Sequence, residues 1–387
     1  MDRGPTGTHR TSTHGGETVR AFVPNPLPPT PPLDLGATIL QQLERANLAV
    51  GRLDGVSAAL PDTHLFLYTY VRKEALLSSQ IEGTQSSLSE LLLFELDQAA
   101  GAPLDDVVEV SNYVAALDHG LARLRGGFPL SNRLLREIHA KLLERGRGSD
   151  KLPGEFRRTQ NWIGGARPGT AHFVPPPPDA VPECMRDLES FLHADGNGLP
   201  ILIRAAMAHV QFESIHPFLD GNGRVGRLLI TLLLCHQGQL RDPLLYLSLY
   251  LKQNRDRYYG LLDRVRQVGD WEAWVEFFLE GVERTATGAV DTAGRLMSLF
   301  AEHRGRIQQA GRKASSALRV HDALKARPVH RLQDVANSTG LSFPAAAAGM
   351  RVLMDLQIAR EVTGKQRNRV FAYDGYLDIL NEGTENL

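Results

Sequence analysis

The segment Val225–His236 limits the fold more than any other part of this 387-residue chain. It is apolar nearly all round at helical spacing, so it predicts a helix that is buried on every side. The segment falls far short of the roughly 18 residues needed to cross a bilayer. A helix of this kind has to be enclosed by other elements, and we therefore expect a mainly helical fold around it.

The segments on both sides of this helix have helical periodicity as well. We expect helices over most of 35–98 and then over Val107–Leu124, Leu130–Leu143, Ala180–His193, Ile201–Ser214, Tyr250–Val265 and Trp271–Thr285. The exception is Gly154–Pro178, which is rich in Gly and Pro and has apolar residues on either side of its centre. This segment predicts a short β-hairpin among the helices.

The two ends of the chain differ from this helical body. Residues 1–20 are rich in Gly, Thr, Ser and His and are expected to be disordered. Pro24–Pro32 holds six prolines in nine residues, which favours a stiff linker across the next domain over an SH3-type ligand. After a long helix over Ala286–Gln309, a short helix, a helix–turn–helix and a basic hairpin predict a winged-helix domain.

The formal net charge of −1 conceals an uneven distribution. Residues 303–370 hold 13 Lys or Arg and four Asp or Glu, a net of +9, so the rest of the chain carries −10. A basic end on an acidic body makes DNA a candidate partner. The chain has only two cysteines, in unlike contexts, and an N-terminus without the apolar segment of a signal peptide, which together favour a cytoplasmic protein.

The segment that carries chemistry leads into the buried helix and reads His-Pro-Phe-Leu-Asp-Gly-Asn-Gly-Arg-Val-Gly-Arg, from His216 to Arg227. Gly221 and Gly223 allow a loop of exposed amides at a helix N-terminus, which suits phosphate. Arg224 and Arg227 lie three residues apart and therefore on one helix face. Two guanidinium groups beside such a loop suit a polyphosphate.

Asp220 and His216 supply the remaining chemistry of this segment. A carboxylate next to phosphates suits Mg²⁺, so Asp220 is the candidate metal ligand. His216 is the group here that can take a proton near pH 7. Zinc is the rival use of both residues, but no second His lies three or four residues away and no Cys is near.

This segment resembles the signature of the Fic family, His-Pro-Phe-x-Asp-Gly-Asn-Gly-Arg-x-x-Arg, at every fixed position. The resemblance implies a mainly α fold, a helical bundle with a small β-hairpin flap, and transfer of AMP from ATP to a hydroxyl side chain of a target protein. It implies that His216 is the base, that Asp220 binds Mg²⁺, and that the phosphates of ATP are held by Gly221, Asn222, Gly223, Arg224 and, at the γ-phosphate, Arg227.

A second resemblance concerns regulation. The segment Ser78-Ser79-Gln80-Ile81-Glu82-Gly83 is similar to the family's inhibitory motif, which Ser78, Glu82 and Gly83 match. In that family the Glu pairs with the second Arg of the signature, here Arg227, and so occupies the γ-phosphate site and misaligns ATP. Without the signature, Glu82 would be interpreted as an exposed helical residue.

Two further sites are assigned with less support. In the flap, Ile163, Phe173 and Val174 are expected to dock an extended target segment as an added strand, or else to cover the core. The candidates for the adenine side are Asn254, Tyr258 and Tyr259, and the alternative is that both tyrosines belong only to the core.

The chain is therefore interpreted as an autoinhibited protein adenylyltransferase (AMPylator) that uses ATP and Mg²⁺, and we also consider self-modification and a homodimer. Its expected parts are an arm (1–32), a helical region with the inhibitory helix (33–105), the Fic core (106–285), and a linker helix with a winged-helix domain (286–387). The alternatives are a DNA-binding regulator that senses nucleotide through the Fic module, and an enzyme that removes AMP from proteins.

The expected partners are ATP and a protein with a Ser, Thr or Tyr hydroxyl, with no membrane. DNA is considered because Arg351, Lys365, Arg367 and Arg369 lie where a recognition helix and wing would meet phosphate. Against DNA, Ala345–Ala348 offers no hydrogen bonds to bases.

Overall fold

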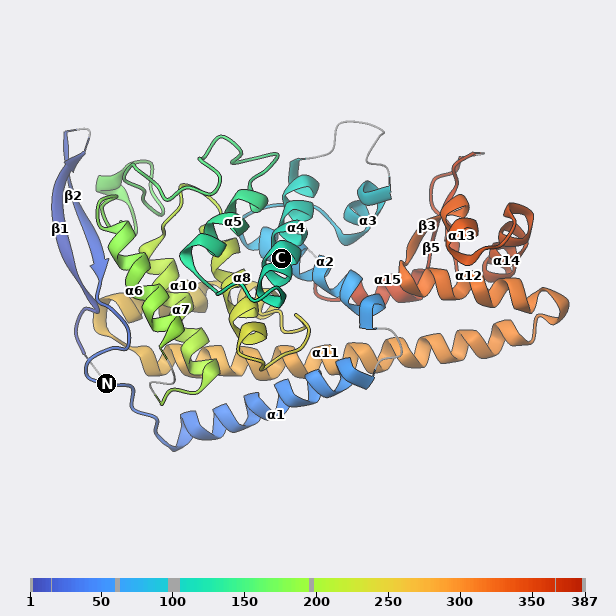
Figure 1. Ribbon diagram of the computed structural model, residues 1–387, viewed down its shortest axis with the longest axis horizontal. Coiled ribbons are helices and arrows are strands. Elements are labelled where there is room, and N and C mark those ends of the chain that lie inside the picture. Colours follow the sequence, from blue (N-terminus) through green and yellow to red (C-terminus); the bar gives the residue numbers. More distant parts are fainter. Residues whose placement is uncertain are drawn as a thin grey trace.

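The computed structural model describes residues 3–14, 16–59, 63–96, 105–194, 198–365 and 367–384, and it is mainly helical (Figure 1). None of the helices in these ranges is long and apolar enough to cross a bilayer. The helices of the larger part are α1 (Ala37–Ala59), α2 (Thr63–Ile81), α3 (Leu88–Leu96), α4 (Asp105–Arg125), α5 (Asn132–Leu142), α6 (Val181–His193), α7 (Ile201–Ile215), α8 (Asn222–His236), α9 (Ser248–Gln253), α10 (Arg255–Val268) and α11 (Trp271–Gln308).

The helix predicted to be enclosed is α8. Its side chains from Asn222 to Leu234 are buried with the exception of Gly223, which is partly exposed. Helices α2, α4, α5 and α7 pack around it. Helix α7, whose side chains from Leu202 to Ile215 are all buried, leads directly into the loop before α8. The prediction of a helical body around this segment is confirmed.

Helix α11 is one element where the sequence predicted two. We expected separate helices over Trp271–Thr285 and Ala286–Gln309, with a domain boundary between them, but the helix continues through this point without a break. No Pro interrupts it, and a glycine inside a helix costs only about 1 kcal/mol. Its N-terminal half packs in the body beside α1, and its C-terminal half extends to a smaller part of the chain (Figure 1).

The N-terminal residues were expected to be disordered, and here the prediction was wrong. Strands β1 (Gly7–His14) and β2 (Glu17–Pro24) form an antiparallel hairpin in which Gly7 pairs with Pro24 (Figure 1). Val19, Ala21 and Phe22 are buried, and β2 packs on α7. The apolar surface that orders the hairpin belongs to the helical body, which a composition argument about residues 1–20 does not include.

The flap region is also simpler than expected. Between α5 and α6, the predicted hairpin consists of one antiparallel bridge, in which the Ile163 amide donates to the Phe173 carbonyl (2.8 Å), and a single 3₁₀ turn, η1 (Pro168–Thr170). The amide of Phe22 in β2 donates to the carbonyl of Val174 (2.9 Å), so the N-terminal hairpin extends the edge of the flap.

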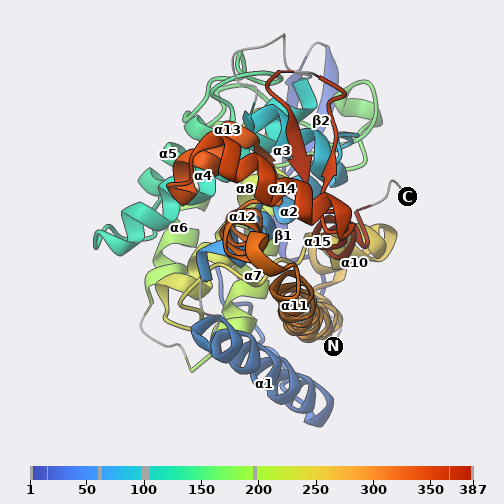
Figure 2. The ribbon, with the colours of Figure 1, turned by 90° about the vertical axis from the view of Figure 1, so that its right-hand side faces the viewer.

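The C-terminal part follows α11 and lies at the opposite end of the molecule from the N-terminal hairpin (Figures 1 and 2). Its small sheet has the antiparallel order β3-β5-β4. The elements, in chain order, are η2 (Gly311–Lys313), α12 (Ala314–Ala326), β3 (Val329–Arg331), α13 (Leu332–Thr339), α14 (Phe343–Asp355), β4 (Arg360–Glu361), β5 (Val370–Ala372) and α15 (Asp374–Asn381). Helix α15 returns to contact α11 and α2.

Candidate functional site

The predicted site is a loop between two buried helices. Helix α7 ends at Ile215, and His216 takes a left-handed conformation (φ 49°) that turns the chain out of the helix. Gly221 also has a positive φ (76°), which a glycine adopts without strain, and α8 begins at Asn222. The loop amides and the N-terminus of α8 therefore lie together, as phosphate binding requires.

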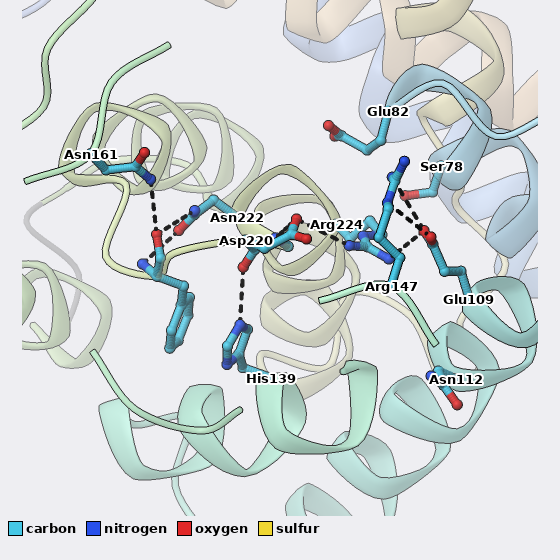
Figure 3. Close-up of polar contacts among 12 residues, drawn as sticks. Ser78, Glu82, Glu109, Asn112, His139, Arg147, Asn161, Asp220, Asn222 and Arg224 are labelled. Atoms are coloured by element: carbon cyan, nitrogen blue, oxygen red, sulfur yellow. Dashed lines mark hydrogen bonds and ion pairs between the residues drawn. The ribbon is translucent and has the colours of Figure 1, made fainter. Parts of the chain in front are cut away.

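Asn222 braces the loop from inside. Its side-chain oxygen accepts from the Phe218 amide (2.8 Å) and its side-chain nitrogen donates to the Phe218 carbonyl (2.9 Å), as Figure 3 shows. Asn161, from the flap region, donates to the same carbonyl (3.3 Å). Both polar groups of the Asn222 side chain thus bond the main chain of Phe218 and fix the shape of the loop.

His139 of α5 holds the next part of the loop. Its Nδ1 accepts from the Gly154 amide (2.8 Å), so its Nε2 carries the proton that it donates to the Asp220 carbonyl (3.0 Å) (Figure 3). Its ring stacks on Phe218 with centroids 3.8 Å apart. Burial lowers the pKa of His139 to about 4, which keeps the ring neutral and this arrangement intact. Sequence reasoning did not find His139, because nothing in its helix marks it.

Arg157, from the segment that leads into the flap region, holds the end of α7. Its side chain is 2 % exposed, and its guanidinium donates to the main-chain carbonyls of His216 (2.8 Å), Pro176 (2.6 Å) and Ile215 (3.3 Å). Its own amide donates to the carbonyl of Pro217 (2.9 Å). Arg157 thus ties the end of α7 to the segment that follows the flap.

His216 itself is partly buried beside cationic groups. Burial, followed by the charges of Arg157 and Arg266, lowers its pKa to about 3, and Glu82 and the carbonyl of Glu213 act weakly in the opposite direction. The Nδ1 atom has no partner in hydrogen-bonding geometry among the described residues. The imidazole is therefore neutral at physiological pH.

Each arginine of the motif is already paired with a carboxylate. Arg224, 1 % exposed, donates to Glu109 of α4 (3.0 Å) and weakly to Asp220 (3.4 Å). Glu109 also pairs with Arg147 (3.0 Å), whose side chain is half exposed (Figure 3). Burial raises the pKa of Glu109 against the charges of these two arginines. Glu109 was not found from the sequence.

Arg227 pairs with the end of α2. It donates to the Ser78 hydroxyl (2.8 Å), the Ser78 carbonyl (2.8 Å) and Glu82 (2.8 Å). Glu82 stands in the turn directly after α2 rather than inside the helix as predicted. A Cβ at Gly223 would meet Glu82 Oε1, so any larger residue there would displace this carboxylate from its present position.

The carboxylate of Asp220 is the candidate metal ligand. Its side chain is 33 % exposed, and Oδ1 accepts from the Gly221 amide (2.6 Å). Gly148 passes so close that a Cβ there would lie 2.7 Å from Oδ2. In the described ranges no three His, Cys, Asp or Glu side chains could hold a metal by themselves. One accessible carboxylate beside a phosphate site fits Mg²⁺, which commonly takes one or two carboxylates plus phosphate oxygens.

The adenine-side candidates do not share one environment. Tyr258 is 1 % exposed and its hydroxyl bonds His209 (2.8 Å), so it lies in the core and its assignment to adenine loses its basis. Asn254 ends α9, and its side chain donates to the Tyr250 carbonyl (2.9 Å). Tyr259 is 39 % exposed and stays a prediction. The expected single helix over Tyr250–Val265 is broken at Asn254.

The flap candidates lie beside the N-terminal hairpin. Phe173 is 9 % exposed, contacts Phe22 at a centroid distance of 6.0 Å, and lies under the guanidinium of Arg266 (3.9 Å). Ile163 and Val174 are partly buried. Target docking by these residues stays a prediction, and Phe173 also covers the core.

The carboxylate–arginine pair in the site gives a stability prediction. Replacing Glu109 with Leu leaves the buried guanidinium of Arg224 without its main partner, and we expect this to lower the free energy of unfolding by about 3–5 kcal/mol. The matched control is Arg147→Ala, which removes a half-exposed partner of the same carboxylate and should cost at most about 1 kcal/mol. Urea unfolding of both variants measures the difference, and equal losses would contradict the assigned role of the Arg224–Glu109 pair.

Buried titratable groups predict acid sensitivity. A buried histidine has a lower pKa in the folded state than in the unfolded state, where it is 6.5. The folded state is therefore most stable above pH 6.5 and loses stability as the pH falls toward the pKa of the folded state. Three buried carboxylates with raised pKa values oppose this loss, but the histidines outnumber them. The histidines are His139, His209, His321 and His330 (pKa about 4) and His216 (about 3), and the carboxylates are Glu74 and Glu213 (about 7) and Glu109.

We therefore expect the free energy of unfolding to fall as pH decreases from 6.5 to 4.5. Each net proton taken up on unfolding contributes about 1.4 kcal/mol per pH unit. Denaturation curves recorded at pH 4.5, 5.5, 6.5 and 7.5 measure the slope. A stability that stays constant or rises toward pH 4.5 would contradict the expected balance.

Comparisons with known proteins match the two halves of the body separately. Residues 129–234 match the model of the Fic/DOC family, and residues 40–122 match that of the Fic/DOC family N-terminal segment. A protein named protein adenylyltransferase Fic from Culex quinquefasciatus is 34% identical over 261 residues, which cover 64% of this chain and 48% of that protein. One of the same name from Aedes aegypti is 34% identical over 262 residues, with the same coverage.

The chain thus spans about half the length of the curated relatives it matches. Among solved structures, it is similar to a Fic family protein from Desulfovibrio desulfuricans G20, with a TM-score of 0.57 and 21% identity. That similarity covers 88% of this chain and 97% of the other, and it supports the mainly helical fold with small antiparallel sheets.

Proposed function

We propose that the chain, whose residues 129–234 match the Fic/DOC family model, is a protein adenylyltransferase that transfers AMP from ATP to a hydroxyl of a target protein. The supporting observation is that a neutral histidine, an accessible carboxylate and two arginines gather at the N-terminal end of α8. His216 would accept the proton of the target hydroxyl. The loop amides, with Arg224 and Arg227, would hold the phosphates.

Mg²⁺ bound to Asp220 would supply neutralisation of charge on the phosphates. The residues of the chain would do the rest. Arg157 and Asn222 hold the main chain of the loop and would thereby keep His216 in one orientation toward the bound substrates. His139 holds the main chain at Asp220. Positioning of this kind is what transfer in line with the leaving pyrophosphate requires.

We further propose that the protein is held in an inhibited form by Glu82. Burial alone would raise the pKa of Glu82, but the charge and hydrogen bond of Arg227 outweigh it and lower the pKa, so Glu82 is a carboxylate at neutral pH. While Arg227 pairs with Glu82, the γ-phosphate of ATP would meet the Glu82 carboxylate in place of the Arg227 guanidinium. ATP would then bind with its α-phosphate misaligned.

Incubation of the purified protein with ATP and Mg²⁺ tests the proposed reaction. Label at the α-phosphate should appear on protein, on an added target or on the chain itself, and label at the γ-phosphate should not. Protein labelling by γ-labelled ATP would instead indicate a kinase. The alternative of a nucleotide sensor predicts ATP binding without any labelling, and an enzyme that removes AMP predicts loss of label from a modified protein.

We also propose that residues 314–373 form a winged helix. The order α12-β3-α13-α14-β4-β5 and the turn at Gly340 (φ 63°) support this proposal. The side chains of Arg351, Lys365 and Arg367 are exposed, as contacts to DNA phosphate need, and Phe343 at the start of α14 is exposed as well. If DNA binds the full chain, the affinity should fall steeply with salt, at a log–log slope of roughly −0.9 per phosphate contact.

A further inference from the structure

A cavity of about 400 Å³ lies outside the site described above, between helices α2, α9 and α11 and the residues that follow α15. Its α2 wall includes Tyr70 and Glu74, and Tyr246 faces them from the segment before α9. The rings of Tyr70 and Tyr246 are 5.3 Å apart. The volume is sufficient for a small organic molecule.

Two polar atoms in this wall lack partners. Glu74 is 3 % exposed, and its Oε1 accepts from the hydroxyls of Ser248 (2.5 Å) and Tyr113 (3.3 Å). Its Oε2 and the hydroxyl of Tyr246, which is 5 % exposed, have no hydrogen-bond partner among the described residues. Buried polar groups are nearly always satisfied, so these two atoms indicate a missing partner at this wall, and for the Glu74 carboxylate oxygen that partner has to be a hydrogen-bond donor.

The cations that line the same cavity are already engaged elsewhere. Arg295 pairs with Glu382 (2.6 Å), Lys73 donates to the Glu382 carbonyl (2.7 Å), and Arg284 pairs with Glu280 (2.7 Å). Among the acidic residues of the lining, Asp291 lies exposed at the rim of the cavity. The cavity thus offers carboxylates at its inner wall and at its rim.

From this geometry we propose that the cavity binds a small organic ammonium ion, with one ammonium group at Glu74 and the tyrosine rings beside it. Tyrosine rings attract cations through their faces, and a carboxylate supplies the hydrogen-bond acceptor that an ammonium needs. An alkyl diammonium suits the site best, because Asp291, which lines the same cavity, supplies a second carboxylate for a second charge.

The position of the cavity links it to the proposed inhibition. Glu74 and Ser78 lie one turn apart on α2, and Tyr113 contacts Glu74. The cavity exists only while α2 lies in its present position. A ligand that contacts α2, α11 and the C-terminal end together would therefore stabilise α2 in that position. Given the proposed function, its binding should slow AMP transfer by the wild-type chain but not by a Glu82→Gly variant.

Calorimetric titration of the full chain with putrescine, n-butylammonium and n-butanol tests the proposal. We expect saturable binding of putrescine, weaker binding of n-butylammonium, and no saturable binding of n-butanol. Glu74→Gln, which keeps the contacts with Ser248 and Tyr113, should weaken putrescine binding about ten-fold or more. The charge-matched control Glu302→Gln, on the far end of α11, should leave it unchanged.

A second variant tests whether Glu74→Gln weakens binding only by disturbing the packing around Glu74. Gly288 lines the cavity and has no atom within 4 Å of a Cβ, so Gly288→Trp should block the space without touching Glu74. Loss of binding in both variants supports the site. Equal binding of n-butanol and n-butylammonium, or no saturable binding of putrescine, overturns it. Binding is measured without ATP, so this outcome is independent of whether AMP transfer is observed.

Discussion

Replacing His216 by Ala should lower the rate of AMP transfer by about 10²–10⁴-fold, the usual contribution of a positioned general base. The reason is specific to this loop. His216 stands at the start of the motif, its ring is neutral because burial lowers its pKa to about 3, and its Nδ1 is bonded to no other group of the described residues. A time course with α-labelled ATP and an activated background such as Glu82→Gly measures the loss.

Nucleotide binding should survive the same change. The main-chain carbonyl of His216, which Arg157 holds at 2.8 Å, is kept in the Ala variant, and so are the amides at the start of α8. The matched control is His236→Ala, which removes a histidine from the other end of the same helix. Transfer near the starting rate in the His216 variant, with ATP still bound, would mean that another group takes the proton.

The placement of the loop residues could be predicted because they are adjacent in sequence. From Asp220 to Arg227, the helical period alone places both arginines and the amides at one helix end. The enclosed helix α8 was predictable for a similar reason, since a segment apolar on all sides has few other solutions. Local patterns therefore gave the motif and the element that supports it.

The supporting residues of the site could not be predicted, because they come from distant parts of the chain. Glu109 reaches Arg224 from α4, and His139 reaches the Asp220 carbonyl from α5. Each looks in its own helix like an ordinary polar residue, and its importance arises only when the helices pack. Buried polar groups need such partners, so the loop motif by itself implied that partners exist but not which ones.

The N-terminal hairpin could not be predicted for the same reason, because it is ordered by contacts with distant residues. Its composition is that of a disordered segment, yet Phe22 contacts Phe173 and donates its amide to Val174. Glu17 adds a pair with Arg167 of the flap region. The interactions that order the strands belong to tertiary structure, which outweighs weak local preference.

Replacing Glu82 by Gly should raise AMP transfer, including self-labelling, by roughly ten-fold or more. Glu82 occupies one face of Arg227 at 2.8 Å, where the γ-phosphate of ATP would otherwise bind. Misplacement of the reacting phosphate by about 1 Å can cost about 10² in rate, so release of Arg227 acts mainly on turnover. A side-by-side labelling time course of wild type and variant at saturating ATP measures the gain.

Two further variants separate charge from shape. Glu82→Gln keeps the size of the side chain but removes the repulsion of phosphate, so it should activate partly, and Glu44→Gln on an exposed face of α1 should not activate at all. Shape matters because the Glu82 side chain lies directly against Gly223 at the start of α8. An activation by Glu82→Gln equal to that by Glu82→Gly would assign the whole effect to charge.

The double variant Glu82→Gly/Arg227→Ala tests the pairing itself. If Glu82 acts by holding Arg227, removal of the arginine abolishes the benefit of freeing it, and the double variant should be no faster than Arg227→Ala alone. If Glu82 inhibited by blocking space alone, the double variant would still be faster than Arg227→Ala. An exposed helical glutamate without a role would give wild-type, Glu82→Gly and Glu82→Gln rates within about 0.5 kcal/mol of one another, which is roughly two-fold. The contacts of Arg227 with the Ser78 hydroxyl and carbonyl do not involve Glu82, so we expect them to remain in the two single Glu82 variants, whose differences then report the carboxylate.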